Sequence, residues 1–177
     1  MPAPGTPDDL VAQIAHLRRY ARALTGDRWA ADDLVQDTLE RACRRWRLWA
    51  VGSDLRAWLF SVMHNLFVDG IRRARRHSSE TPADDFALEQ APAPSAPIDR
   101  ALDLQACLMR LPEEQREVLL LVTLQDLGYA DVARITGVPV GTVMSRLSRA
   151  RSRLRELMEE EDQPGALPRR PGLRRMK

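Results

Sequence analysis

The stretch GVPVGTVMSRLSRARSRL, from Gly137 to Leu154, gathers positive charge on one short segment. Five arginines fall within ten positions, at 146, 149, 151, 153 and 155, although the whole chain of 177 residues has a net charge of only +2. A short helical pattern, YADVARI, comes before it, and the turn between them contains Gly137, a residue suited to positive φ. Two helices joined by a tight glycine turn are typical of a helix-turn-helix. The segment therefore predicts a DNA-binding module.

The second helix of this module has two sides. Val138, Val143 and Leu147 are expected to face inward and hold it against the first helix. The residues expected to face outward are Gly141, Thr142, Met144, Ser145, Ser148 and Arg149. Apart from Met144 and Arg149 their side chains are short, so the helix can approach base edges in a major groove. We expect Arg146, Arg151 and Arg153 to reach phosphates. A solvated basic helix would explain the charge, but not the turn and the small outward residues.

The rest of the chain predicts an all-α protein with two small helical domains. Helix-forming Ala, Leu and Arg are abundant and glycine is scarce. A first domain is expected over residues 6–76 and a second over 99–158. Residues 77–98 are rich in proline and small side chains, so they predict a flexible linker. The tail 159–177 lacks a core pattern and is predicted to be disordered.

Local signals place the helix ends. Thr6 followed by Pro7 predicts a helix start, and Gly26 the end of that helix. A second helix is expected to begin near Asp27, and Ser53 or Asp54 to cap a third. In the second domain the run VLLLVTL is apolar on all sides, which predicts a central buried helix that Gly128 closes.

The sequence contains no pattern typical of catalysis or of a cofactor. Cys43 and Cys107 are the only cysteines, and both are predicted to be buried free thiols. The cysteines and three histidines lack the spacing of a zinc site, although a thiol or metal sensor stays open as an alternative. We expect no enzyme activity, no cofactor and no metal.

The N-terminus does not resemble a signal peptide and no apolar run is long enough to insert into a membrane, which favours a cytoplasmic protein.

At this point the sequence resembles a family. The string LPEEQREVLLLVTLQDLGYADVARITGVPVGTVMSRLSRARSRL resembles the fourth domain of bacterial RNA polymerase sigma factors of the extracytoplasmic-function (ECF) class. LTGDRWAADDLVQDTLERA resembles the polymerase-binding helix of the second sigma domain, and RAWLFSVMHNLFVDGIRRARR its promoter-melting helix. The resemblance covers about residues 10–76 and 99–157. It implies an alternative sigma factor that binds core RNA polymerase and directs transcription initiation at particular promoters.

The resemblance implies several partners. Core RNA polymerase would be contacted at its β′ coiled coil and its β flap, promoter DNA at its −10 and −35 elements, and an anti-sigma factor would control activity. The β′ contact falls on a polar, mostly acidic face that comprises Asp33, Gln36, Asp37 and Glu40. Pairing within the helix, Asp37 with Arg41 and Glu40 with Arg44, is an alternative for two of these residues. Glu40 and Cys43 stand where the family commonly has apolar or aromatic residues.

The DNA contacts are likewise implied residue by residue. The −10 element would be contacted by Trp49, Ser53, Asp54, Asn65, Arg72 and Arg76. The −35 element would be contacted by Thr142, Met144, Ser145, Arg146, Ser148, Arg149, Arg151 and Arg153. Arg149 is the best candidate for a guanine contact, because a guanidinium fits the two major-groove acceptors of guanine. Met144 stands where the family often has a basic residue.

Besides the thiol or metal sensor, two further alternatives are open. Core packing would explain Trp49 as well as base capture does, and it is the preferred interpretation of Trp58. A stand-alone helix-turn-helix regulator would explain the second domain. It would not explain the acidic face of the first domain or the resemblance of that domain to a promoter-melting helix.

Overall fold

In the computed structural model, the described residues are 7–46, 54–78 and 96–161. Within these ranges the chain is helical, without β-strands, as predicted. The helices are α1 (Pro7–Thr25), α2 (Arg28–Arg44), α3 (Leu55–Ser78), α4 (Ala96–Met109), α5 (Glu113–Thr123), α6 (Tyr129–Thr136) and α7 (Val140–Glu161). Among the described residues, no helix combines the length and the hydropathy that a membrane span requires.

The predicted end signals of the first three helices are confirmed wherever the structure describes them. Gly26 follows α1 with φ of 73°. Asp27 caps α2, because its Oδ1 accepts the Ala30 N–H at 2.7 Å. Asp54 caps α3 in the same way and accepts the N–H of Arg56 at 2.9 Å. Thr6 and Ser53, the other two expected caps, lie outside the described residues.

Helices α1, α2 and α3 form an N-terminal unit around one apolar core. Leu17, Leu24 and Leu59 are fully buried. The ring of Tyr20 packs edge-on against Phe60, with ring centroids 5.1 Å apart. Edge-to-face geometry suits aromatic quadrupoles, so the pair joins α1 to α3 specifically.

The predicted core role of Trp58 agrees with its place in the N-terminal unit. Its side chain is half-buried and packs against the core. Its ring also lies 6.3 Å from that of Trp46, centroid to centroid.

Helices α4 to α7 form a C-terminal unit with α5 at its centre. The predicted burial of α5 is confirmed, since Val118 and Leu121 are inaccessible to solvent. The prediction that Gly128 closes this helix was wrong. Helix α5 ends at Thr123, and Gly128 instead precedes α6, because the intervening turn places Leu127 in the core.

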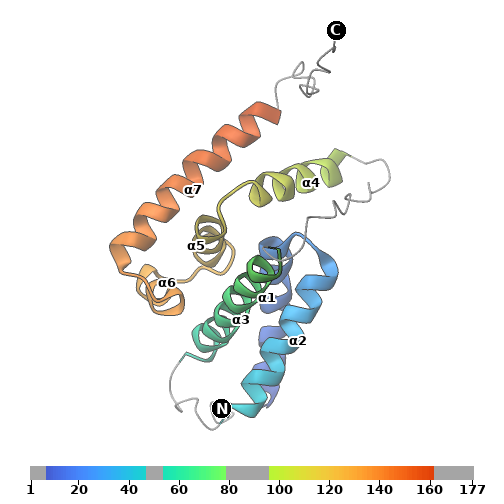
Figure 1. The fold of residues 1–177 in the computed structure, drawn as a ribbon, viewed down its shortest axis with the longest axis vertical. Coiled ribbons are helices and arrows are strands. Elements are labelled where there is room, and N and C mark those ends of the chain that lie inside the picture. The colour runs from blue at the N-terminus through green and yellow to red at the C-terminus, as the bar shows by residue number, and fades with distance from the viewer. Residues whose placement is uncertain (1–6, 47–53, 79–95, 162–177) are drawn as a thin grey trace.

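The two units pack against each other, which the sequence did not predict. Helices α4 and α5 contact α1, and α6 contacts α3, as Figure 1 shows. Met109 of α4 lies so close to Gly26 that a Cβ atom added there would be 2.5 Å from its sulfur. One continuous cluster of buried side chains therefore runs through both units.

Three further predictions need adjustment. Cys107 is buried as expected, but Cys43 is exposed, because α2 turns that position away from the core. Helical structure extends into both ends of the expected linker, to Ser78 and from Ala96, and residues 79–95 lie outside the described residues. Helix α7 continues three residues into the expected tail, where Glu160 forms an ion pair with Arg110 at 3.1 Å.

Candidate nucleic-acid interface

The predicted helix-turn-helix is present in α6 and α7. Gly137 adopts φ of 68° and ψ of 25°, the left-handed conformation that glycine enters without a steric penalty. The Val138 N–H then donates to the Ala133 carbonyl at 3.2 Å and completes the turn. Val143 and Leu147 are buried, as expected, so α7 is held against α6 by apolar packing.

The opposite side of α7 forms an accessible face. Met144 is 52% exposed, and Ser148 and Arg149 are exposed beside it. Thr142 and Ser145 are half-buried, and the Ser145 hydroxyl donates to the Thr142 carbonyl at 3.0 Å. Short side chains flank one long cation, an arrangement that can enter a major groove.

The arginines of α7 differ in whether they form ion pairs within the protein. Arg146 is paired with Glu114 of α5, and only 20% of its side chain is exposed. Arg153 lies 3.0 Å from Glu156 of the same helix. Arg149 and Arg151 are exposed and form no ion pair with any residue that the structure describes. Their charges are available to phosphates or base edges.

A second accessible surface lies on α2. Asp33, Gln36, Asp37 and Glu40 are all exposed, and we call these four residues the acidic face. The buried side of α2 is formed instead by Ala31, Val35, Thr38 and Ala42. Glu40 accepts hydrogen bonds from Gln36 and Arg44, both at 3.3 Å. Within the described ranges, Asp33 and Asp37 form no ion pair, so pairing inside the helix accounts for Glu40 alone.

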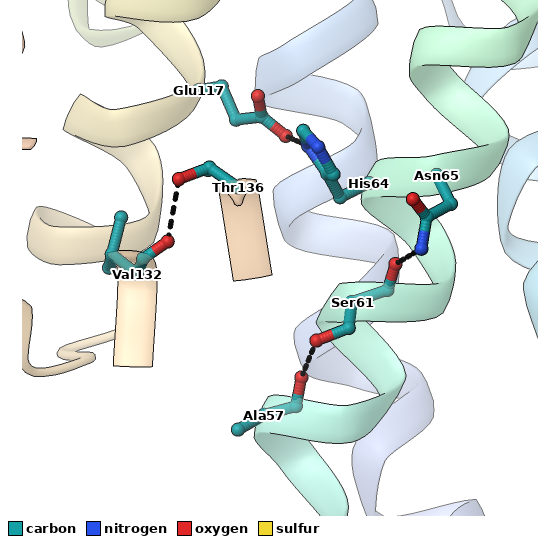
Figure 2. Close-up of polar contacts among 7 residues, drawn as sticks. All are labelled: Ala57, Ser61, His64, Asn65, Glu117, Val132 and Thr136. Atoms are coloured by element: carbon teal, nitrogen blue, oxygen red, sulfur yellow. Dashed lines mark hydrogen bonds and ion pairs between the residues drawn. The ribbon is translucent and has the colours of Figure 1, made fainter. Parts of the chain in front are cut away.

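The residues proposed for the −10 element are only partly described. Trp49 and Ser53 lie outside the described residues, and Asp54 serves as the cap of α3. Asn65 is exposed, and its amide nitrogen donates to the Ser61 carbonyl at 2.8 Å (Figure 2). Arg72 and Arg76 are exposed farther along the same helix, one turn apart.

The sequence did not reveal a set of polar contacts between the two units, which we call the seam. Figure 2 shows His64 of α3 pointing at Glu117 of α5, with Nδ1 and Oε1 2.5 Å apart. Both side chains are largely buried, at 14% and 7% exposed. The pair therefore joins α3 to α5 through a short polar contact in a largely buried place.

Further seam contacts lie on either side of this pair. The Arg56 guanidinium donates to the Gln125 Oε1 at 2.9 Å, and Gln125 in turn donates to the His16 carbonyl at 3.3 Å. Arg75 reaches Glu113 at 2.7 Å. These partners are between 38 and 109 positions apart along the chain, so no local spacing could have identified them.

Burial at the seam shifts two pKa values. Desolvation in the core raises the pKa of the Tyr20 phenol well above its usual value, and the carboxylate of Glu117 raises it further. Desolvation lowers the pKa of the Arg116 guanidinium, an effect that Glu113 opposes. Arg116 donates to the carbonyls of Leu108 and Met109, both at 3.3 Å, and so fixes the turn between α4 and α5.

A cleft of about 740 Å³ opens beside Arg116. The second half of α3 forms one wall, with Phe67 and Ile71, and the start of α5 forms the other. The described residues contain no group of three or more His, Cys, Asp or Glu side chains arranged to hold a metal ion.

Comparison with known families matches both units separately. Residues 10–64 match the family model described as the Sigma2 domain of PhyR. Residues 101–154 match the model described as Sigma-70, region 4. These ranges include the acidic face and the helix-turn-helix, respectively.

Similar proteins cover both units at once. The ECF RNA polymerase sigma factor EcfG of Rhodopseudomonas palustris is 40% identical over 152 residues, which are 85% of this chain and 83% of that protein. SigM of Mycobacterium tuberculosis is 35% identical over 142 residues, covering 80% of this chain and 71% of SigM. Among solved structures, the sigma factor RpoE in complex with the anti-sigma factor NepR from Bartonella quintana matches with a TM-score of 0.72 and 34% identity, covering 86% of this chain and 95% of RpoE.

Proposed function

The chain belongs to the ECF family of RNA polymerase sigma factors, and we propose that it binds core RNA polymerase in the cytoplasm and directs it to particular promoters. The observation that carries this proposal is the 40% identity to EcfG, which extends over both units rather than over the DNA-binding unit alone. A stand-alone helix-turn-helix regulator would need only α4 to α7. The protein would supply recognition and positioning, and the polymerase would supply the chemistry.

The C-terminal unit would recognise the −35 element and contact the β flap of the polymerase. Arg149 and Arg151 support this role, because both are exposed cations on the helix that would enter the groove. Arg149 would contact a guanine, while Arg151 would contact the phosphate backbone and add affinity without sequence preference. Arg146 and Arg153 would reach phosphates only after leaving Glu114 and Glu156, so we expect smaller contributions from them.

The N-terminal unit would bind the polymerase and open the −10 element. The acidic face of α2 would dock on the β′ coiled coil, since Asp33 and Asp37 form no ion pair with any described residue. Asn65, Arg72 and Arg76 would contact DNA from the exposed side of α3. Trp49, Ser53 and Asp54 precede that helix and would complete the −10 surface. We assign these roles to residues 6–76 and 99–158, joined by a linker at 77–98.

An anti-sigma factor would control this activity. The support is the similarity to RpoE, which was solved in complex with the anti-sigma factor NepR. The cleft beside Arg116 lies where α3 meets α5, so a partner bound there would contact both units. Such a partner would fix their relative position and prevent them from reaching two promoter elements at the same time.

Reconstituted transcription tests the proposed function. Purified protein is added to core RNA polymerase on a library of bacterial promoter fragments, and the start sites are sequenced. We expect start sites that share upstream elements and that are absent with core enzyme alone. If the protein neither joins core enzyme at low salt nor yields new start sites, the sigma function is wrong.

Two arginine substitutions test how the −35 element is recognised. Arg149→Ala should weaken binding to the preferred sequence by roughly 1–3 kcal/mol and relax the preference at one base pair. Arg151→Ala should weaken binding to all sequences and reduce its salt dependence. Affinities of the holoenzyme for promoter variants at several salt concentrations distinguish the two. Equal losses on every sequence would contradict the assignment of Arg149.

A further inference from the structure

Trp29 stands out among the tryptophans in the part of the chain that the structure describes. Trp46 and Trp58 pack against each other, whereas 78% of Trp29 is exposed. The Trp29 side chain also has no ring contact or hydrogen bond with any other described residue. Tryptophan is highly buried on average, and it has only a modest helix propensity, so neither the core nor α2 itself accounts for it.

Trp29 lies on the same side of α2 as the acidic face. It precedes Asp33 by four residues, Gln36 by seven and Glu40 by eleven, the spacings that align side chains along one face of a helix. The buried side of α2 lies opposite. Trp29 therefore extends the acidic face by one turn toward the N-terminus of the helix.

We propose that Trp29 is the aromatic anchor of the surface that docks on core RNA polymerase. This inference rests on the proposed function and adds to it an apolar contact point. Interfaces concentrate their binding energy in a few residues, and tryptophan is enriched among them. The acidic residues would then orient the partner, while the indole would supply most of the buried apolar area.

Charge complementarity identifies the chemistry of the partner. Asp33 and Asp37 are exposed and form no ion pair with any described residue, so their charge favours a basic partner surface. An arginine or lysine that pairs with these carboxylates can place its stem or its cation on the indole face. A second copy of this chain is disfavoured, because a symmetric contact would place two acidic faces together.

Affinity measurements on the full-length protein test the anchor. We expect Trp29→Ala to raise the Kd for core RNA polymerase about 10- to 100-fold, and Trp29→Phe to raise it by a smaller factor, because a smaller ring buries less area. The far-UV CD spectrum and the Tm should stay unchanged, since the side chain has no partner in the described fold. Val11→Ala is the matched control, because Val11 is 62% exposed but lies on α1.

Hydroxyl-radical footprinting gives a second, independent measurement. Oxidation of Trp29 should fall at least severalfold when core RNA polymerase is added, while oxidation of Val11 should not change. An unchanged Kd for Trp29→Ala overturns the proposal, whether or not Trp29 is protected, because a contact without energy is not an anchor. Loss of binding to an anti-sigma factor with unchanged binding to polymerase overturns it as well.

The same assay separates this inference from the proposed function. Wild-type protein that fails to bind core RNA polymerase would refute the sigma function itself. Wild-type binding that survives Trp29→Ala but is lost on charge reversal of the acidic face would leave the sigma function standing and refute only the anchor.

Discussion

Two helices of this protein carry clusters of acidic side chains, and the two clusters have different surroundings. On α5, Glu113, Glu114 and Glu117 each face a basic group of another helix, namely Arg75, Arg146 and His64. On α2, Asp33 and Asp37 are exposed and form no ion pair with any described residue. The first cluster joins parts of the fold, and the second is available to another molecule.

The difference shows that an acidic pattern does not define its own role. In the sequence, both clusters have arginines nearby with which they could pair, such as Arg116 for the first and Arg41 for the second. Tertiary packing forms ion pairs between α5 and basic groups of α3 and α7, whereas Asp33 and Asp37 of α2 form none with the described residues. The consequence is testable, because substitutions on α5 should affect stability and substitutions on α2 should affect binding.

The largest expected effect is on α2. Changing Asp33 and Gln36 together to lysine should weaken binding to core RNA polymerase more than about 100-fold, equivalent to roughly 2.7 kcal/mol, because repulsion replaces attraction to a basic partner. Binding by labelled full-length protein measures the loss. Asp103→Lys is the control, since it adds positive charge at an exposed position of α4. Retained binding by the double variant would mean that the acidic face is not the docking surface.

The next effect concerns the buried pair at the seam. Glu117→Ala leaves the largely buried His64 without its carboxylate and should reduce the free energy of unfolding by about 1–3 kcal/mol. Urea unfolding measures this change. A double-mutant cycle with His64→Ala should give a coupling energy above about 0.5 kcal/mol. Additive effects of the two substitutions would show that the pair does not hold the units together.

The smallest effect is expected at Glu113. Its ion pair with Arg75 is largely exposed, with 73% of the arginine side chain accessible. Exposed pairs contribute about 0–1 kcal/mol, so Glu113→Ala should lower the free energy of unfolding by no more than that. The same urea titration compares it directly with Glu117→Ala. A loss equal to that of Glu117→Ala would contradict the distinction between buried and exposed contacts.

Local sequence signals predicted the helices well, because helix ends depend on nearby residues. Asp27 and Asp54 cap as expected, and Gly26 and Gly137 take the left-handed conformation at helix ends. The failures arose where a neighbouring element decides the outcome. Gly128 does not close α5, because the turn after that helix places Leu127 in the core. Cys43 faces solvent, because the packing of α2 turns that position away from the core.

The candidate sites divide in the same way. Periodicity alone placed Val143 and Leu147 inward and Met144 and Arg149 outward. It could not show that Arg146 is paired with Glu114, since that contact joins residues 32 positions apart. The acidic face was identified from its spacing, but Trp29 was missed, because an aromatic residue near a helix start gives no sign of whether the core will cover it.

By itself, the sequence determined that the protein is all-α, that it carries a helix-turn-helix and that an acidic stripe follows one side of α2. These properties depend on helical periodicity, capping and turn residues, all of which act over a few positions. Only the tertiary structure decided which charges remain available to partners. That outcome depends on how α1 and α3 pack on α4, α5 and α6, and such packing joins residues that are distant along the chain.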